Sequence, residues 1–408
     1  MTSNADCRRK FLCKSGAALA VGLAGCASRI RNTSDDAAKL VPRYDPDDEH
    51  QLIRVAVSVE TVVASTIPEP ESSPDGPGSA YVFERSSETW GQEAELSLPE
   101  DAPEDEFGDP IAIDGDTVLI GSWYEDTSEE GLSGTAYVFD RSGDGGWNQR
   151  ARLVPDVDDS EGNPSRHVHA IAIDGDTAIL GCPATSADSG EWQGSAFAYR
   201  RTDEGWHQQA ELVPDDSDGG NEYGHSVALA GDVALIGAPT SDTAAGANAG
   251  AVFAFERSNG EWVQRGRLVA NDDGAGDKFG SAVALSERTA LVAGNDDTDT
   301  AGSVSVFERN GNAGWSQRTT LLTGGESSCI GTVSLEGETA LVGDACQNST
   351  AVFVRTDDGW DRRETLVAPN GAGETFGNAV SLSDDTAVVA DWRQSVEGGY
   401  GAAYVFSL

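Results

Sequence analysis

The residues that could carry acid–base or metal chemistry are few and scattered. The histidines are His50, His167, His169, His207 and His225. Only His167 and His169 are close in sequence, and on a strand their side chains would share one face, but no third metal ligand follows at a recognisable spacing. No Gly-x-Ser-x-Gly turn, phosphate-binding loop or HExxH helix occurs, and the carboxylates suggest no acid–base pair. The sequence therefore predicts no catalytic residues.

Runs of aspartate are the only candidates for a cation site. The weak metal candidates are Asp215, Asp216, Asp218, Asp272, Asp273 and Asp277. Carboxylate oxygens are ligands that Ca²⁺ prefers, but the spacing of these runs does not recur from one part of the chain to the next. The acidity of the whole chain explains them without a ligand. We therefore assign no metal and no cofactor.

The net charge narrows the range of partners. The chain of 408 residues has 27 Lys and Arg against 69 Asp and Glu, a formal net charge of −42. Such a chain repels nucleic acid and anionic lipid, so neither is an expected partner. The carboxylates are spread along the sequence and Lys is nearly absent, which resembles the proteins of halophilic archaea. The resemblance implies a surface that stays hydrated in strong brine.

The first 26 residues look like an export signal. Arg8 and Arg9 precede an apolar run that is too short to cross a bilayer, and Leu-Ala-Gly-Cys ends it at Cys26. The pair of arginines resembles a twin-arginine signal, and the last four residues resemble a lipobox, which implies lipidation of Cys26. The alternative is an ordinary cleaved signal. We expect an exported protein anchored to the outer side of the cytoplasmic membrane, with residues 27–36 as a tether.

One pattern recurs along the chain at an interval of roughly 50–60 residues, a period typical of propeller blades. Each copy reads as four short strands, of which the first two are joined by a tight turn. The centres of the first strands are Val55-Ala56-Val57, Ile111-Ala112-Ile113, Ile171-Ala172-Ile173, Val227-Ala228-Leu229, Val283-Ala284-Leu285, Val333-Ser334-Leu335 and Val380-Ser381-Leu382. The fold class predicted for residues 37–408 is therefore all-β, a seven-bladed β-propeller of four-stranded blades.

The fourth strands begin near a tryptophan in six copies, at Trp90, Trp147, Trp206, Trp262, Trp315 and Trp360. The seventh copy ends at Leu408 without a fourth strand. Residues 37–42 read like a fourth strand, because Ala38-Lys39-Leu40-Val41-Pro42 matches Ala151-Arg152-Leu153-Val154-Pro155. We expect this N-terminal strand to complete the last blade and close the ring, which would leave no open sheet edge.

The repeats resemble the FG-GAP family of integrin-like propellers. The FG element is Phe107-Gly108, Tyr223-Gly224, Phe279-Gly280 and Phe376-Gly377, and the GAP element is clearest at Gly237-Ala238-Pro239. Members of this family often hold calcium between the first two strands. Here that connection is as short as Asp114-Gly115-Asp116, too short for the 6 to 8 oxygens that Ca²⁺ takes, so the resemblance leaves calcium open and the loop argues against it.

Two cysteines are placed for a disulfide. Cys329 comes just before the first strand of the sixth copy and Cys346 just after its second strand. In an antiparallel pair these positions lie at the same end, so the two Cα atoms could come within the distance of a bridge. Cys182 reads as a small core residue.

Three tryptophans stand outside the repeat and fall in or beside the connections between second and third strands. With nearby tyrosines they form the ligand-binding candidates Trp123, Tyr124, Trp192, Trp392 and Tyr400. In a meander these connections share one face, opposite the tight turns. The alternative is that these aromatic side chains fold back onto the blades. We expect the face with the turns to look toward the membrane and the tryptophan face to look outward.

Three functions remain open. The first is a binding module that presents this face to a protein or glycan outside the cell. The second is a propeller enzyme acting on glycans, because Arg201-Thr202-Asp203-Glu204-Gly205-Trp206 resembles the Asp-box turn of sialidases, although that turn is structural there and neither an arginine cluster nor a tyrosine nucleophile is marked here. The third is a structural component of the cell surface. The sequence does not indicate an oligomeric state.

Overall fold

The structure is a computed structural model that describes residues 37–408 apart from short segments of the connections. The segments left out are residues 44–49, 69–77, 88, 99–106, 127–131, 157–166, 187–191, 215–221, 272–273, 295–301, 312–313, 323–327, 370–374 and 397–398. The predictions for the signal, for Cys26 and for residues 27–36 therefore lie outside the described residues. In the described part no helix is long and apolar enough to cross a membrane.

The described elements are strands, as predicted, and they fall into consecutive groups that we call units 1 to 7. Unit 1 is β2 (His50–Ser58), β3 (Thr61–Pro68), β4 (Ser79–Ser86) and β5 (Thr89–Leu96). Unit 2 is β6 (Phe107–Asp114), β7 (Thr117–Asp126), β8 (Leu132–Arg141) and β9 (Trp147–Leu153). Unit 3 is β10 (Ala170–Asp174), β11 (Thr177–Ser186), β12 (Trp192–Thr202) and β13 (Gly205–Leu212).

The remaining units follow the same order. Unit 4 is β14 (Ser226–Ala230), β15 (Val233–Ala238), β16 (Ala251–Ser258) and β17 (Glu261–Leu268). Unit 5 is β18 (Ala282–Ser286), β19 (Thr289–Gly294), β20 (Ser303–Arg309) and β21 (Trp315–Leu322). Unit 6 is β22 (Ile330–Glu336), β23 (Thr339–Asp344), β24 (Ser349–Thr356) and β25 (Gly359–Val367). Unit 7 is β26 (Phe376–Ser383), β27 (Thr386–Val396) and β28 (Gly399–Ser407), with β1 (Ala38–Leu40) beside β28.

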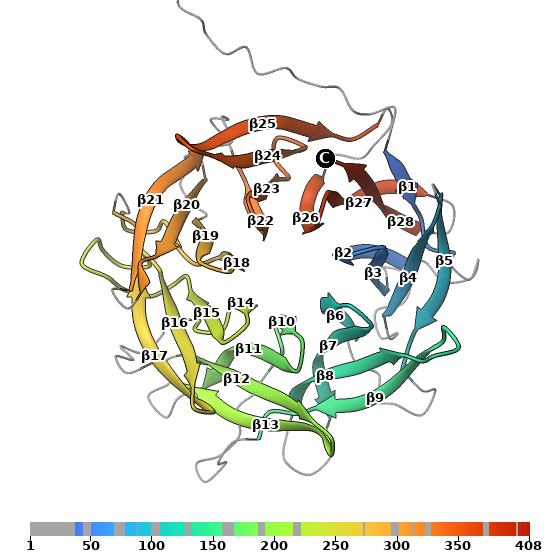
Figure 1. Cartoon of the computed structure of the whole chain (residues 1–408), viewed down its shortest axis with the longest axis horizontal. Helices are drawn as coiled ribbons and strands as arrows, with labels where there is room; N and C mark the ends of the chain where they lie inside the picture. Colours follow the sequence, from blue (N-terminus) through green and yellow to red (C-terminus); the bar gives the residue numbers. More distant parts are fainter. Residues whose placement is uncertain are drawn as a thin grey trace, which may run out of the picture.

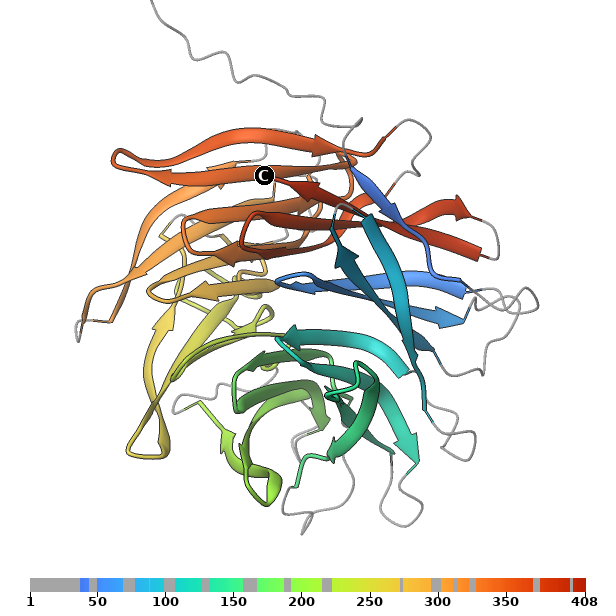
Figure 2. The ribbon, with the colours of Figure 1, turned by 45° about the vertical axis from the view of Figure 1, so that its right-hand side comes forward.

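Units 2 to 6 are each a separate antiparallel sheet of four strands, whereas units 7 and 1 belong to one sheet of eight strands. Two residue pairs, His50 with Gly399 and Gln51 with Tyr400, connect β2 to β28 in that sheet. Figure 1 shows the units side by side around a common axis, with the first strand of each nearest the centre. Figure 2 shows the strong twist of the sheets.

The core lies between the units. Seven hydrophobic clusters each combine buried side chains of two consecutive units, and the cluster of units 7 and 1 is one of them. The repeated tryptophans of the fourth strands pack against six of these clusters. Alternate residues of a strand point to opposite faces, so each sheet can bury both faces against its neighbours. The apolar runs of the inner strands follow from this double burial.

The connections between first and second strands, and in units 1 to 6 those between third and fourth strands, lie at one end, which we call the hairpin face. The opposite end, the loop face, carries the other connections. At the hairpin face, seven two-residue turns join the first and second strands, and the first turn residue has positive φ in all seven: Val59, Gly115, Gly175, Gly231, Glu287, Gly337 and Asp384. Glycine occupies four of these positions because it adopts positive φ without strain.

Candidate functional site

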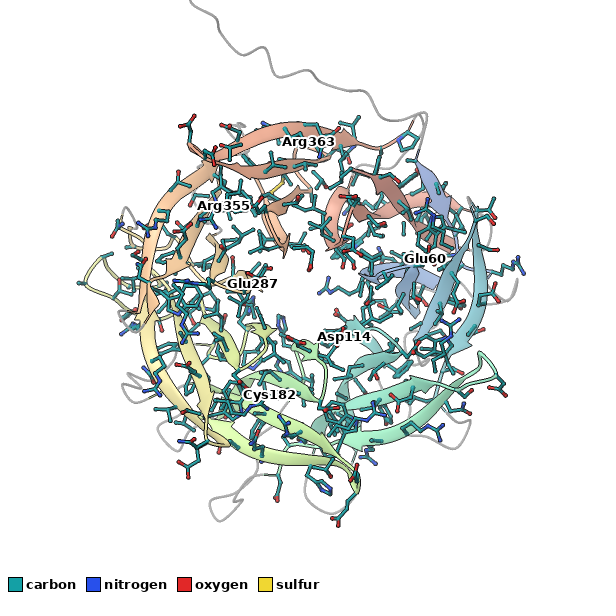
Figure 3. All side chains as sticks on the ribbon, viewed as in Figure 1. Glu60, Asp114, Cys182, Glu287, Arg355 and Arg363 are labelled. Carbon is teal, nitrogen blue, oxygen red and sulfur yellow. A yellow bond between two sulfur atoms is a disulfide. The ribbon has the colours of Figure 1, made fainter. Side chains whose placement is uncertain are left out.

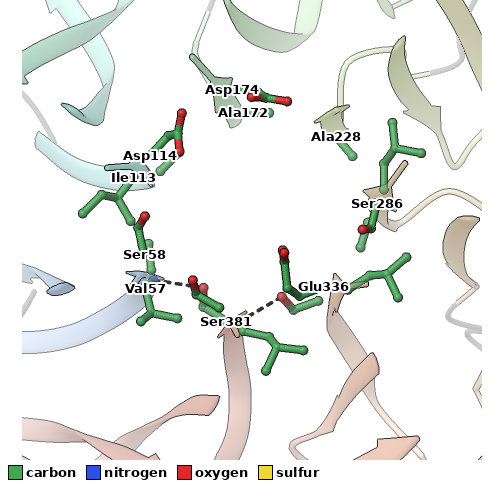
Figure 4. Close-up of a pocket in the computed structure, with 18 of the residues that line it drawn as sticks. Val57, Ser58, Ile113, Asp114, Ala172, Asp174, Ala228, Ser286, Glu336 and Ser381 are labelled. Carbon is green, nitrogen blue, oxygen red and sulfur yellow. Dashed lines mark hydrogen bonds between the residues drawn. The ribbon is translucent and has the colours of Figure 1, made fainter. Parts of the chain in front are cut away.

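A cavity of about 850 Å³ lies on the axis toward the hairpin face. The ends of the seven first strands and their turns line it, and Figure 4 shows Asp114, Asp174, Ser286 and Glu336 around it. Its apolar walls come from residues such as Val57 and Ala172, which lie in the first strands. Figure 3 also places Asp114 and Glu287 near the centre, whereas Arg363 lies on an outer strand.

Among the residues that the structure describes, those lining the cavity include acidic groups and no basic side chain. Its lining carboxylates are Asp114, Asp174, Glu287, Glu336 and Asp384. Burial and, next, the charge of Asp384 raise the pKa of Glu336 above its ordinary value, with Asp174 and Glu287 adding to the effect. The carboxylates therefore interact across the cavity and make it unfavourable for an anion.

Two of these carboxylates have a structural role, because they accept backbone hydrogen bonds from the next unit. Asp114 accepts from Gly175 N at 2.7 Å and Asp174 accepts from Gly231 N at 2.6 Å. Serine does the same elsewhere: Ser58 Oγ accepts from Gly115 N, Ser286 Oγ from Gly337 N and Ser383 Oγ from Val59 N, each at 3.0 Å. We call these five bonds the turn ring. They explain why acidic or hydroxyl residues recur before the turns, a pattern that is visible in the sequence.

Three histidines meet at the loop-face end of the axis, just before the inner strands of units 3 and 4. The rings of His169 and His225 are 4.5 Å apart between centroids, and those of His167 and His169 are 6.2 Å apart. His169 Nδ1 lies 2.8 Å from the backbone oxygen of His225, so this nitrogen carries the proton and donates. The sequence suggested the pair His167 and His169 but missed His225, because it belongs to the next copy of the repeat.

The environment of these histidines favours their neutral forms. Burial, with the neighbouring His169 next, lowers the pKa of His225 to about 4, and Lys278 adds to the effect. Burial also lowers the pKa of His169 and of His167. Neutral imidazole offers one ring nitrogen as a hydrogen-bond acceptor, but the lowered pKa values make these rings weaker bases near pH 7 than an ordinary histidine. The described residues contain no group of three His, Cys, Asp or Glu side chains arranged for a metal ion.

The five predicted aromatic residues lie in the second and third strands, beside the connections that the sequence indicated. Trp123 and Tyr124 belong to β7, Trp192 to β12, Trp392 to β27 and Tyr400 to β28. The pairing of a second strand with its third strand shifts register, for example between Ser122 and Glu125, and both strands continue past the shift. The sequence did not indicate this continuation.

The side chains of Trp392 and Tyr400 differ in their surroundings. Trp392 is partly buried, and its Nε1 donates to the carbonyl oxygen of Ile53 at 3.0 Å, so this ring is tied to unit 1. Tyr400 is 42% exposed. The alternative of an aromatic side chain folded back onto the units thus holds for Trp392, whereas Tyr400 remains available to a ligand.

Most of the acidic metal candidates lie outside the described residues, namely Asp215, Asp216, Asp218, Asp272 and Asp273. Asp277 is described, and its Oδ2 accepts a hydrogen bond from Gly274 N at 2.5 Å. The Asp-box-like turn also has an internal role, because Thr202 Oγ1 donates to the carbonyl oxygen of Gly205 at 3.1 Å.

The cysteines are arranged as the strand directions predicted. Cys329 and Cys346 form a disulfide with Cα atoms 5.2 Å apart, and Cys182 is a buried residue of the core cluster that units 2 and 3 share. Asp344 supports the same corner: it accepts from Cys329 N and Gln347 N, both at 3.1 Å, and from Ser328 Oγ at 2.6 Å.

Glycines of the FG and GAP elements meet across the boundary between units. A Cβ on Gly237 of unit 4 would lie 2.2 Å from the carbonyl oxygen of Gly280 in unit 5. The same holds for Gly181 with Gly224, at 2.1 Å, and for Gly343 with Gly377, at 2.2 Å. The FG glycines also have positive φ. These positions need glycine because two backbones touch there.

Comparison with known families identifies the same repeats. Residues 90–139, 206–255, 262–307 and 360–406 match a family model described as FG-GAP repeat. Each matched segment begins at a fourth-strand tryptophan and ends in the third strand of the next unit. The match supports the predicted FG-GAP repeats. No curated protein sequence matches the chain.

Solved structures support a propeller-like fold. A protein from Lactobacillus plantarum has 14% identity and a TM-score of 0.53, over 78% of this chain and 85% of that one. The periplasmic gluconolactonase PpgL of Pseudomonas aeruginosa has 16% identity and a TM-score of 0.53, with the same coverage. KlAtg21, in complex with the coiled coil of AgAtg16, has 11% identity and a TM-score of 0.53, over 88% and 99%. Proteins of such different kinds share this fold, so the likeness assigns no activity.

Proposed function

Taking the FG-GAP repeats as the premise, we propose that this chain is an exported, lipid-anchored, seven-bladed propeller that binds a protein or glycan outside the cell through its loop face. The units would be the blades, and Cys26 the lipid attachment point. The repeats and the all-β fold support the scaffold. The shape of the two faces supports the choice of binding surface.

Contacts between the first and last units support a closed ring of seven blades. Strand β1 pairs with β28, and buried Leu40 joins the cluster shared by units 7 and 1. Ser381 Oγ and Ser383 Oγ accept from Val57 N and Val59 N, both at 3.0 Å. On this view the eight-stranded sheet is two blades joined by a short contact.

The closure can be tested by placing a charge on β1. Leu40 is buried and Lys39 is exposed. Leu40→Asp should destabilise the protein by roughly 3 kcal/mol or more, because an unpaired charge would enter the core, whereas Lys39→Asp should change little. Equal midpoints of chemical unfolding for the two variants would argue against the N-terminal strand as part of the ring.

The observation that carries the binding proposal is the difference between the two faces. The seven turns between first and second strands have the same length. On the loop face, the second-to-third connections vary from the short 397–398, between β27 and β28, to the long 239–250, between β15 and β16. The connection from β9 to β10 is longer still and spans 154–169. Variable connections on a uniform scaffold are typical of a recognition surface.

The tether supports an outward loop face. Strand β1 occupies the position of the fourth strand in unit 7, so it begins at the hairpin face. Residues 27–36 would join that end of the strand to the lipid. Ten residues reach at most about 35 Å. The hairpin face would therefore be held near the membrane.

Photo-crosslinking in intact cells tests this arrangement. A photoreactive residue would replace Tyr400 on the loop face or Asn259, an exposed turn residue on the hairpin face. We expect one stoichiometric adduct from position 400 and none from position 259. Adducts from 259 alone would reverse the orientation, and a regular array of self-adducts would favour a structural surface component.

A second candidate is an enzyme, and the stacked histidines are the observation that favours it. They lie at the loop-face end of the axis with neutral rings, and His225 is 3.6 Å from Glu222. The unprotonated ring nitrogens could accept a hydrogen bond from a water molecule and orient it toward a glycan or a sugar lactone. If a panel of these substrates is turned over, His169→Gln should reduce kcat at least tenfold; turnover that survives this change would place the chemistry elsewhere.

A further inference from the structure

A circumferential series of ion pairs joins neighbouring units near the hairpin face. An acidic residue near the end of one third strand pairs with an arginine at the end of the next unit's third strand. The pairs are Glu84 with Arg141, Asp140 with Arg201 at 2.8 Å, Glu256 with Arg309 at 2.8 Å, and Glu308 with Arg355. We call them the rim pairs.

In units 4 and 5 the rim glutamate also binds a second arginine, three residues after the fourth-strand tryptophan of its own unit. Arg265 Nε is 3.3 Å from Glu256, and Arg318 Nε is 2.8 Å from Glu308. Each of these glutamates therefore serves two guanidinium groups, one from its own unit and one from the next.

Unit 2 departs from this arrangement at Arg150, which occupies the same position after Trp147. The rim acid there is Asp140, one methylene shorter than glutamate, and its Oδ1 already accepts from Thr117 Oγ1 at 2.8 Å and from Arg201. Arg150 is exposed and has no ion pair or hydrogen bond with the part of the chain that the structure describes. A guanidinium group of the series is thus left without its carboxylate.

This guanidinium lines a cleft of about 470 Å³ between units 2 and 3. Arg141, Arg201 and Trp206 also line it, together with Asp116, Asp140 and Asp203. Three arginines and three aspartates line the cleft, so it is far less acidic than a chain with a net charge of −42 is on average, and two of the arginines are paired with aspartates of the cleft. A cleft of this volume accommodates one or two sugar rings.

Trp206 adds a second donor without an acceptor. At the next boundary, Trp262 Nε1 donates to Gln209 Oε1 at 3.1 Å. Arg150 stands where Gln209 stands in unit 3, and a guanidinium only donates. Accordingly, the buried Nε1 of Trp206 has no acceptor among the residues that the structure describes. The boundary of units 2 and 3 thus has two donors, Arg150 and Trp206 Nε1, where the boundary of units 3 and 4 has a donor and an acceptor.

We propose that this cleft binds a sugar acid, whose carboxylate pairs with Arg150. A planar carboxylate matches the guanidinium fork. Asp116, Asp140 and Asp203 make a doubly charged phosphate unfavourable, but Asp116 and Asp203 can accept hydrogen bonds from sugar hydroxyl groups. The site lies toward the hairpin face, so it is separate from the proposed loop-face function and does not depend on it.

The test is titration of the folded full-length mature chain with D-glucuronate, D-glucose and inorganic phosphate, in the lowest KCl concentration that keeps it folded. The indole N–H resonance of Trp206 and isothermal calorimetry would report binding. We expect saturable binding of glucuronate, at least tenfold weaker binding of the other two probes, and a shift of the Trp206 resonance.

Variants connect the binding to this cleft. Arg150→Gln should weaken glucuronate binding at least tenfold. Arg265→Gln, the matched control in unit 4, should leave binding unchanged, and both variants should keep the wild-type circular dichroism spectrum. Equal binding by wild type and Arg150→Gln, equal binding of glucose, or no saturable glucuronate binding to folded wild type would each overturn the proposal.

Discussion

Contacts of single glycines explain the FG-GAP motif in physical terms. The carbonyl oxygen of an FG glycine in one unit occupies the space that a Cβ on a GAP glycine of the preceding unit would need, as in Gly280 and Gly237. The buried aromatic residue of the FG element then packs edge-on against the third strand of its own unit, as Phe279 does against Phe307 at 5.8 Å between centroids. The motif is thus a backbone contact followed by an aromatic anchor.

Gly237→Ala tests that contact. The added Cβ would lie 2.2 Å from a backbone oxygen, so units 4 and 5 must separate, and we expect a loss of roughly 2–4 kcal/mol in the free energy of unfolding. Gly266→Ala is the control, because nothing lies within 4 Å of the Cβ that it would add and its φ is ordinary; it should change stability by less than about 1 kcal/mol. Similar midpoints of urea unfolding for both variants would contradict the contact.

The lowered pKa of His225 predicts how the stability of the protein depends on pH. Its folded value of about 4 lies below the ordinary 6.5, so between these values the unfolded chain binds more protons, and stability falls as pH decreases through this window. Burial lowers its pKa most, followed by His169, Lys278 and His167, while Glu222 lies 3.6 Å away. Between pH 6.5 and 4, the free energy of unfolding of His225→Gln should decrease less than that of the wild type. The difference should be on the order of 2 kcal/mol, allowing for the partial exposure of His225.

Chemical unfolding across that pH range would measure the effect. His207→Gln is the matched control because His207 is an exposed histidine of β13, the outer strand of unit 3. If both variants follow the wild-type profile, the histidine stack does not couple to folding.

At the scale of elements, the two-residue turns do more than reverse the chain. The side chain of the residue before each turn can accept a hydrogen bond from a backbone N–H of the next unit. The turn ring consists of these bonds at five boundaries. Ala230, which precedes the turn of unit 4, has no side-chain acceptor. Glu336 lies at the same position in unit 6, and its raised pKa reflects burial and the neighbouring carboxylates.

Paired substitutions test the turn ring. Ser58→Ala should cost about 1 kcal/mol, because Gly115 N loses its partner. Ala230→Ser should add a bond to Glu287 N and stabilise by about 0.5–1 kcal/mol. Thermal unfolding of the two variants should move in opposite directions, and a shift in the same direction would mean that these turns do not contribute through this bond.

At the scale of the whole molecule, the net charge of −42 has few basic side chains to offset it. Several arginines are used in the rim pairs between units, so the remaining surface is strongly acidic. Self-repulsion of such a surface opposes the compact state, and salt screens it, because the Debye length falls to about 3 Å at 1 M.

We therefore expect the thermal midpoint to rise by roughly 10 °C between 0.2 and 2 M KCl, since screening should add several kcal/mol. NaCl at equal ionic strength should give the same rise if screening is the cause. A midpoint independent of salt would contradict the interpretation of the surface as adapted to brine.

The sequence by itself determined the repeat and its phase. The apolar triplets, the turn residues and the tryptophans located the strands of all units, because each unit must bury the same faces against its neighbours. Strand direction was also sufficient to pair Cys329 with Cys346, since an antiparallel pair brings its two flanking residues to one end. These are local or periodic features.

Only the tertiary structure decided what meets across the boundaries between units. His225 stacks on His169 although they belong to different copies of the repeat, because the units lie side by side around the axis. Trp392 is held by the backbone of Ile53 at the opposite end of the sequence. Arg150 lacks a carboxylate because the shorter Asp140 bonds Arg201 of the next unit instead. Periodicity places residues within a unit, whereas these contacts depend on the rotation from one unit to the next.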